Sequence, residues 1–177
     1  MLERIIIAGA GGQGSVLLGK LMALTAMDIF PHITFFPAYG AEVRGGASHC
    51  QVVMSSTEIA SPCAEQADAL ILMNQHDAAG FVAQLAPKGL AVVNSSLCHI
   101  RQVPRGRRLV SIPASAMADQ LGSPRSANIV MLGALLRHKP LFSMAAAEQT
   151  IRKLPSGAPG MLEINLRALQ AGHQAAG

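Results

Sequence analysis

The sequence predicts an α/β fold with three α/β/α layers, a mostly parallel sheet and a Rossmann-like first β-turn-α unit. Short, nearly continuous apolar runs alternate with helix-like stretches, as is typical of parallel strands that helices cover on both faces. The first apolar run, Arg4–Ala8, breaks into a glycine-rich turn and resumes as a helix-like stretch from Ser15. The last third of the chain carries apolar residues at intervals of three and four, the period of amphipathic helices.

The expected elements follow in order along the chain. Strands are expected at Arg4–Ala8, Ile33–Phe36, His49–Ser55, Ala69–Met73, Leu90–Asn94 and Leu109–Ile112. Helices are expected at Ser15–Met27, Asp77–Leu85, Ser115–Leu121, Ala127–Arg137, Ser143–Leu154 and Met161–Ala171. Ser126 stands directly before one of these helices and Ser143 is the first residue of another, and both are predicted N-caps. Of the two strands expected at 33–36 and 49–55, one can run antiparallel to the rest of the sheet.

The turn after the first strand is the candidate binding site. It contains Gly9, Gly11, Gly12, Gln13 and Gly14. Glycines permit backbone dihedrals that a Cβ forbids, and they let a ligand approach the main chain. The helix that follows directs free N–H groups and its positive dipole end at this turn, which favours phosphate or carboxylate. The alternative is a turn that only lets helix and strand pack closely.

The spacing of Gly9, Gly11 and Gly14 also matches the dinucleotide fingerprint, with a strand before it and a helix after it. A dinucleotide site needs in addition an acid about 20 residues further on, at the end of the second strand, to hold the ribose hydroxyls. Asp28 precedes the expected second strand, and Glu42 lies beyond it in a loop. The sequence therefore disfavours a nicotinamide or flavin dinucleotide.

A second unusual segment connects the second and third expected strands and holds the only tyrosine of the chain. Its proline and glycines exclude a regular helix, so Tyr39, Glu42 and Arg44 are expected on a loop beside the glycine turn. Arg44 offers a planar fork of donors for carboxylate or phosphate, and Gly45 and Gly46 let a partner's backbone come close. The alternative is a hairpin connection with an exposed ion pair between Glu42 and Arg44, a contact worth little.

Together the two segments resemble the gamma subunit of the 2-oxoacid:ferredoxin oxidoreductases. The resemblance is carried by the glycine turn with Gln13 inside it and by the order Tyr-Gly-x-Glu-x-Arg-Gly-Gly at 39–46, and the stretch 128–134 also resembles a late helix of that domain. It covers most of the chain and weakens over 95–108 and after 139. Neither motif is strong alone, but the two rarely occur together by chance.

The resemblance implies a reaction performed by an assembly, in which a 2-oxoacid, coenzyme A and oxidised ferredoxin give acyl-CoA, carbon dioxide and reduced ferredoxin. The implied partners are alpha and beta subunits, with a delta subunit where there is one, and these hold thiamine diphosphate and the iron–sulfur clusters. The gamma subunit is expected to be inactive alone. Its rim of glycine turn and Tyr39–Ser48 loop is expected to face the partners and to contact coenzyme A or another anionic group. The first expected substrate is 2-oxoglutarate, ahead of branched-chain oxoacids and pyruvate.

Length and composition fit one domain that spans residues 1–177. Half of the residues are hydrophobic and 14% are charged, so the chain can bury a sizeable core. The mean hydropathy of +0.35 indicates that some apolar surface faces a partner. No apolar run approaches the roughly eighteen residues of a membrane span, and glycines interrupt the N-terminal apolar patch before a signal-peptide core forms. The cytoplasm is the expected compartment.

The cysteines and histidines do not form a metal-binding motif. Cys50, Cys63 and Cys98 are far apart, whereas an iron–sulfur cluster needs four clustered thiolates. Each is therefore expected to be a small buried hydrophobe. The six histidines show no helical pair at metal-ligand spacing. His49, which follows the Arg-Gly-Gly loop, is expected on a strand edge.

The remaining residues do not indicate a catalytic centre in this chain. It has no Gly-x-Ser-x-Gly elbow and no phosphate-binding lysine after the glycine turn. Asp68, before an apolar run, is expected to cap or solvate a strand start. Aromatic residues are too few to stack nucleic-acid bases, so nucleic acid is disfavoured despite the net charge of +4. The arginines of the irregular segment 101–108 either meet an acidic subunit or the phosphates of coenzyme A, or form a solvated loop.

Two other classes of function stay open. A free-standing Rossmann-type dinucleotide enzyme is supported by the glycine spacing and weakened by the missing acid. An interaction module with no ligand of its own would use residues 9–14 for packing and Arg44 as an interface anchor.

Overall fold

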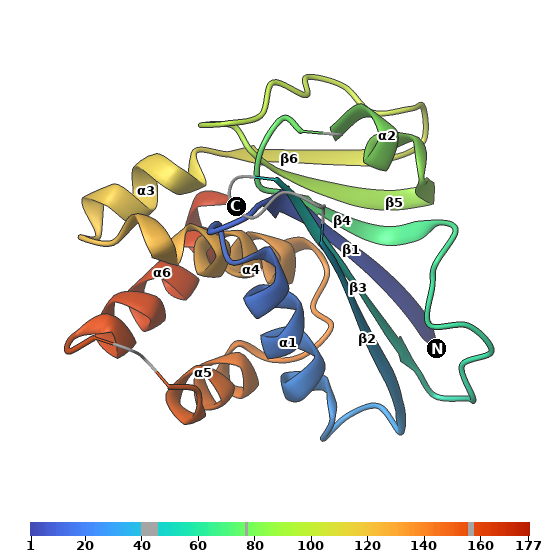
Figure 1. The fold of residues 1–177 in the computed structure, drawn as a ribbon, viewed down its shortest axis with the longest axis horizontal. Coiled ribbons are helices and arrows are strands. Elements are labelled where there is room, and N and C mark those ends of the chain that lie inside the picture. Colours follow the sequence, from blue (N-terminus) through green and yellow to red (C-terminus); the bar gives the residue numbers. More distant parts are fainter. Residues whose placement is uncertain (40–45, 77, 156–157) are drawn as a thin grey trace.

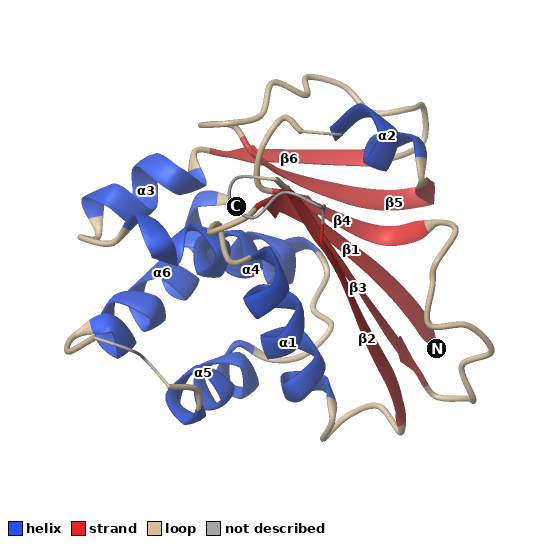
Figure 2. Ribbon diagram, viewed as in Figure 1, coloured by secondary structure: helices blue, strands red, loops and turns tan. Residues whose placement is uncertain are grey.

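The computed structural model describes residues 1–39, 46–76, 78–155 and 158–177, and it shows one six-stranded sheet with helices packed against it (Figure 1 and Figure 2). The strands are β1 (Leu2–Ala10), β2 (His32–Tyr39), β3 (Ala47–Ser55), β4 (Ala67–Leu72), β5 (Leu85–Asn94) and β6 (Arg108–Ile112). The helices are α1 (Ser15–Ala26), α2 (Ala78–Ala83), α3 (Ala114–Gln120), the 3₁₀ turn η1 (Pro124–Ser126), α4 (Ala127–His138), α5 (Met144–Lys153) and α6 (Met161–Ala175).

The strand order is β2-β3-β1-β4-β5-β6. Strands β1, β4, β5 and β6 run parallel, whereas β3 is antiparallel to both of its neighbours, β1 and β2. The prediction of a mostly parallel sheet is therefore confirmed, and the antiparallel member is β3. In this register Ala10 pairs with Ala47 and Tyr39 pairs with Ser48, so the carboxyl ends of β1 and β2 share one rim with the start of β3.

Two hydrophobic cores cover the two faces of the sheet. On one face lie α1 and α4, with α3, α5 and α6 around them (Figure 1). The opposite face is covered by the short α2 and by part of the segment before β6. Ile5 and Ile7 enter the first core and Ile6 enters the second, because successive side chains of a strand point to opposite faces. The three expected layers are present, and the layer that contains α2 is thin.

Strands β1 and β4 are fastened by one ion pair near their starts. The carboxylate of Asp68 accepts hydrogen bonds from the backbone N–H, Nε and Nη2 of Arg4, at 3.0, 2.9 and 3.0 Å. The hydrogen bond to Asp68 raises the pKa of the Arg4 guanidinium. Instead of capping or solvating the start of its own strand, Asp68 holds the neighbouring strand in register.

The ends of the expected elements shift by a few residues, most of all at β5, which begins at Leu85. Of the two predicted N-caps, Ser143 is confirmed, since its Oγ accepts the N–H of Ala146 at 3.1 Å. Ser126 occupies the N-cap position of α4 as predicted, but its side chain does not cap the helix. The turn η1 precedes α4, and the Ser126 hydroxyl instead donates to Oδ1 of Asn165 at 2.8 Å.

The three cysteines have different surroundings. Cys50 and Cys98 are buried, as predicted. Burial raises the pKa of the Cys50 thiol to about 12 and also raises the pKa of Cys98. The prediction is wrong for Cys63, which is exposed. None of the helices in the four described ranges is long and apolar enough to cross a membrane.

Candidate functional site

The glycine turn at the carboxyl end of β1 is held by a small set of hydrogen bonds. The N–H of Gly11 donates to the carbonyl of Gly46 at 2.9 Å, which fastens the turn to the start of β3. Oε1 of Gln13 accepts the N–H of Ala10 at 2.7 Å, and the N–H of Gln13 donates to the Ala10 carbonyl at 3.1 Å. The side chain of Gln13 therefore folds back and closes the turn from within.

The glycines of this turn have different roles. A Cβ on Gly9 would lie 2.9 Å from the Cβ of Met73, and one on Gly14 would lie 2.5 Å from Nδ2 of Asn128. These two positions need glycine because neighbouring groups pack against the backbone. Gly12 has a φ of +93° and open space where a Cβ would stand. Of these three glycines, Gly12 is the one that leaves room for a ligand to approach.

Helix α1 begins directly after the turn with its positive end uncompensated. Its N-cap is Gly14, in the left-handed conformation, and among the described residues no side chain caps the helix. Its first turn contains no acidic residue. Ser15 is buried, with Oγ 3.1 Å from Oγ of Ser48. An anionic group from outside would complement the free N–H groups and the dipole.

The turn lies beside a crevice at a switch point of the sheet. Strands β1 and β4 are parallel neighbours, but β1 leads into α1 on one face and β4 leads into α2 on the other. Ligands of open α/β sheets bind beyond the carboxyl ends of the strands at such points. Here the crevice has a volume of about 250 Å³, and its lining includes Gly12, Gln13, Met73, Ser115, Asp119 and Arg125.

One wall of the crevice is fixed by Asn94, a fully buried residue at the end of β5. Its Nδ2 donates to the carbonyl of Met73 at 3.1 Å and to Oγ of Ser115 at 2.9 Å. Its Oδ1 accepts the N–H groups of Ser115 and Ser96, at 3.2 and 3.3 Å. Since a carboxamide offers two donors and one acceptor oxygen with two lone pairs, this side chain is satisfied and ties β4, β5 and α3 together.

Arg125 is the cation that lines this crevice in the described part of the chain, and sequence reasoning missed it. The side chain is exposed and forms no ion pair with the described residues. Its backbone is held by η1, which begins at Pro124 and ends at the anchored Ser126. The sequence feature that could have indicated Arg125 is a proline followed by a basic residue at the start of a helix. The corresponding feature for Asn94 is a polar residue at the end of an apolar strand.

Part of the predicted site lies outside the described residues: Glu42, Arg44, Gly45 and the side chain of Tyr39. The two described ends of that loop do meet the glycine turn, because Tyr39 pairs with Ser48 in the sheet and Gly46 accepts the N–H of Gly11. The expectation that the loop begins at the same rim as the turn is therefore confirmed. The roles of the individual loop residues stay predictions.

The sheet order adds a reason against a dinucleotide site. In the dinucleotide fold the acid that binds the ribose stands at the end of the second strand, next to the glycine turn. In this chain the strand beside β1 is β3, and its first residues at this rim are Ala47 and Ser48. Neither can accept hydrogen bonds from ribose hydroxyls through a carboxylate.

The basic segment 101–108 is partly used within the fold. Nε of Arg107 donates to the carbonyl of Leu85 at 2.6 Å, and Nη2 of Arg108 lies 2.9 Å from Nδ1 of His138. Arg101, Arg105 and Arg108 are exposed, whereas Arg107 is partly buried. The three exposed arginines thus keep donors for the solvated or partner-binding role expected from the sequence.

Residues 4–175 match the family model of pyruvate ferredoxin/flavodoxin oxidoreductase. The chain is 32% identical to the ketoisovalerate oxidoreductase subunit VorA of Methanothermobacter marburgensis over 96% of its own length and 35% of that protein. It is also 32% identical to the 2-oxoglutarate synthase subunit KorC of the same organism, over 98% of this chain and 96% of the relative. The chain thus spans about a third of the VorA relative and nearly all of the KorC relative.

Solved structures give the same result. The gamma subunit of the keto/oxoacid ferredoxin oxidoreductase from Geobacter sulfurreducens has a TM-score of 0.80 and 30% identity, covering 99% of this chain and 97% of that subunit. A 2-oxoglutarate:ferredoxin oxidoreductase from Magnetococcus marinus, solved with 2-oxoglutarate, coenzyme A and succinyl-CoA bound, has a TM-score of 0.87 and 25% identity, covering 99% of this chain and 31% of that one. The predicted resemblance is therefore confirmed.

Proposed function

This chain belongs to the pyruvate ferredoxin/flavodoxin oxidoreductase family, and we propose that it serves as the gamma subunit of a 2-oxoacid:ferredoxin oxidoreductase complex. The observation that carries the proposal is the end-to-end likeness to a solved gamma subunit, 99% of this chain against 97% of that one. In the proposed complex, alpha and beta subunits hold thiamine diphosphate and the iron–sulfur clusters, and ferredoxin accepts the electrons.

Within that complex the rim around the glycine turn contacts coenzyme A. The described residues fit an anionic ligand, because helix α1 has an uncapped N-terminus, Gly12 leaves open space and Arg125 supplies a cation. Arg44 is proposed as a second cation at this rim, and Glu42 and Tyr39 as its neighbours. These residues bind and orient the anion. The carbon chemistry is supplied by thiamine diphosphate when it is bound in the partner subunits.

The outer surface at the end of α1 supports contact with partner subunits. Leu24, Met27 and Ile29 are exposed at the end of this helix and just after it, and exposed apolar groups that gather on one side of a protein mark interaction surfaces. They account for part of the apolar surface that the mean hydropathy predicted.

The proposed substrate is 2-oxoglutarate. The support is that the chain covers 96% of the 2-oxoglutarate synthase subunit and only 35% of the ketoisovalerate oxidoreductase subunit at the same identity. Branched-chain oxoacids and pyruvate are the alternatives.

The test is to purify the native assembly through a tag on this chain and to assay it with a panel of oxoacids, coenzyme A and oxidised ferredoxin. Copurification with a thiamine-diphosphate subunit and turnover that depends on coenzyme A are expected. The variant Arg44→Ala is expected to raise the KM for coenzyme A. If the complex with Arg44→Ala keeps its assembly, KM and turnover, Arg44 has no part in the site. If no thiamine-diphosphate subunit copurifies, the proposed function is wrong.

A further inference from the structure

A group of cations lies at the amino ends of β5 and β6, where the proposed function gives it no role. This basic patch consists of Lys88, Arg105, Arg107 and Arg108. The N–H of Lys88 donates to the carbonyl of Gly106 at 3.1 Å, and Arg108 pairs with Leu90 in the sheet. The bend of β5 and the turn before β6 therefore lie side by side, at the end of the sheet away from α3 (Figure 1).

The charge of the basic patch is not compensated within the described part of the chain. Lys88, Arg105 and Arg108 are exposed, and none of the four cations forms an ion pair with a described acid. The acids at the same end of the sheet, Glu3 of β1 and Asp68 of β4, already have cationic partners. The patch therefore presents positive charge to the solvent.

The backbone at Lys88 is strained. Its φ of +65° lies in the left-handed region, and no other residue of the described ranges except glycine has a positive φ. The register of β4 with β5 shifts between Ala67 and Ala69, so residues 86–89 bulge out of the ladder. A glycine would adopt this conformation freely. A lysine held in strain on an exposed bulge indicates a function for its charge.

The surroundings of the basic patch favour a transient contact over a permanent one. Residues 85–88 and 104–108 include none of the large apolar side chains that are exposed in the described ranges. Permanent subunit interfaces have an apolar core from which charged residues are depleted. Charged surfaces without such a core steer rapid and weak association, as in electron-transfer complexes.

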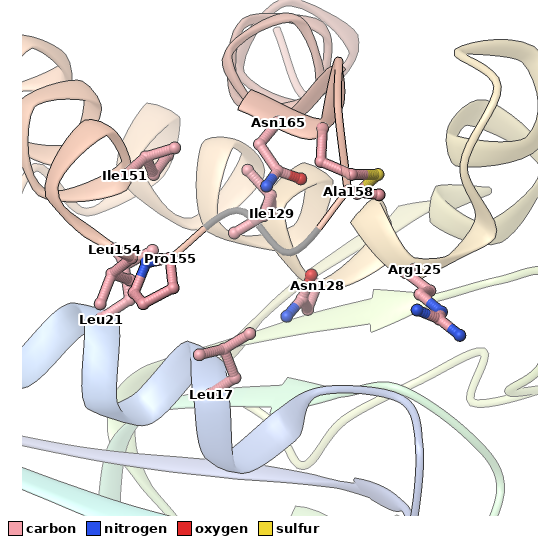
Figure 3. A pocket seen from close by; sticks show the side chains of 11 residues that line it. Leu17, Leu21, Arg125, Asn128, Ile129, Ile151, Leu154, Pro155, Ala158 and Asn165 are labelled. Atoms are coloured by element: carbon pink, nitrogen blue, oxygen red, sulfur yellow. The ribbon is translucent and has the colours of Figure 1, made fainter. Parts of the chain in front are cut away.

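The basic patch is also separate from the candidate site. Arg125, the cation of that site, lies beside the glycine turn and lines a cavity of about 320 Å³ between α1, α4, α5 and α6 (Figure 3). The glycine turn follows the carboxyl end of β1, whereas the patch lies at the amino ends of two strands parallel to β1. Its segments contain no aromatic residue for nucleic-acid bases to stack on. An acidic protein therefore fits the patch better than a nucleotide or a nucleic acid.

We propose that the basic patch is the docking surface for the ferredoxin that accepts the electrons of the complex. The proposal rests on the proposed function, which makes ferredoxin a partner that must bind and leave in each cycle. An iron–sulfur cluster held by four cysteine thiolates carries a net negative charge, and the patch offers the complementary charge. Docking here requires that the partner subunit with the last cluster lies beside the amino ends of β5 and β6.

The experiment uses the complex purified through a tag on this chain and compares two electron acceptors, ferredoxin and methyl viologen. The double variant Lys88→Glu/Arg105→Glu reverses two exposed charges. It should raise the KM for ferredoxin about five- to thirty-fold at low salt, because attractions between exposed charges become repulsions. At about 0.5 M salt, where the Debye length is roughly 4 Å, the difference should fall below about two-fold. Turnover with methyl viologen and the KM for coenzyme A should stay unchanged.

A single variant separates docking from folding. Because glycine accepts a positive φ, Lys88→Gly should melt at or above the wild-type temperature. It should nevertheless raise the KM for ferredoxin about two- to five-fold, the size of one exposed ion pair. The control Lys153→Glu/Arg167→Glu makes the same change in net charge at exposed positions of α5 and α6. It should leave the KM for ferredoxin unchanged.

The proposal fails if the double variant and its control change the KM for ferredoxin equally, or if neither changes it. Loss of a partner subunit from the double variant would assign the patch to a permanent subunit contact and would also overturn it. So would RNA that binds the wild type and not the double variant, with an unchanged KM for ferredoxin. In each case the proposed function survives if the wild-type complex reduces methyl viologen with an oxoacid and coenzyme A. Absence of that turnover removes both.

Discussion

Helices α4 and α6 cross with their backbones in contact. We predict that one added methyl group at this crossing lowers the melting temperature of the protein. A Cβ on Gly172 would overlap the carbonyl of Val130, and one on Gly133 would overlap the carbonyl of Leu169. In both cases the obstacle is backbone, which cannot rotate away as a side chain can. Gly172→Ala therefore forces the two helices apart.

The expected cost follows from that geometry. Overpacking costs about 1–3 kcal/mol where side chains can adjust, so a clash with a fixed carbonyl is expected to cost about 3 kcal/mol or more. For a chain of 177 residues, each kcal/mol lowers the melting temperature by about 2–4 °C. Gly172→Ala should therefore melt about 6–12 °C below the wild type. The separation should also widen the cavity that residues of α4 and α6 line.

The assay is thermal unfolding followed by circular dichroism, with Gly80→Ala as the control. Gly80 is an exposed residue of α2, and a Cβ there would meet nothing within 4 Å. Alanine is favoured over glycine in a helix by up to about 1 kcal/mol, so the control should melt at or slightly above the wild-type temperature. A Gly172→Ala protein that melts within 2 °C of the wild type would show that the helices do not touch in this way.

Four further predictions concern the turn, the thiols and the sheet. Gly9→Ala should lower the melting temperature, because its Cβ would stand 2.9 Å from Oε1 of Gln13; adding Gln13→Ala should restore part of the loss. In the native protein an alkylating reagent should label Cys63 alone at pH 8, as mass spectrometry of digested protein will show. Burial raises the pKa of the Cys50 thiol from 9.0 to about 12 in the folded protein. The contribution of the protonated thiol to the free energy of unfolding is therefore complete below pH 9 and is lost between about pH 9 and 12. Urea unfolding at a series of pH values should show this decline. Asp68→Ala should cost about 1–2 kcal/mol in the same urea assay, the value of a partly exposed charge-assisted pair; a smaller change than 0.5 kcal/mol would contradict it.

Most of the fold could be predicted from the sequence because local signals and burial agree. The run Ile5–Ile7 is apolar without alternation, and the structure shows why: its side chains serve the cores on both faces in turn. The N-cap at Ser143 was predictable since its hydroxyl acts three residues away. Ser126 has the same local pattern, but a partner 39 positions along the chain takes its hydroxyl. Contacts of that range leave no local signal.

The candidate site was predicted in part for the same reason. The glycine turn is a local motif, so its position could be predicted from the sequence. Which of its glycines are closely packed depends on Met73 and Asn128, which belong to distant segments of the chain. Arg125 reaches the crevice only because η1 packs beside the turn, and a lone exposed arginine gives no pattern in the sequence. The path of the strands adds a reason against a dinucleotide site that the sequence did not provide, since β3 inserts beside β1 where the fingerprint assumes the next strand.

The contact between Gly14 and Asn128 joins the glycine turn to helix α4, 114 residues further along the chain. A buried asparagine in the apolar helix α4 is costly unless its carboxamide is bonded, and Asn128, 2% exposed, donates to the carbonyl of Gly14. Only glycine leaves space for that carboxamide, because a Cβ would stand 2.5 Å from Nδ2. The pair sets the position of α4, and therefore of Arg125 just before it, relative to the N-terminus of α1. In a Gly14→Ala protein, Arg125 would thus lie farther from the N-terminus of α1, although every side chain that lines the crevice is unchanged.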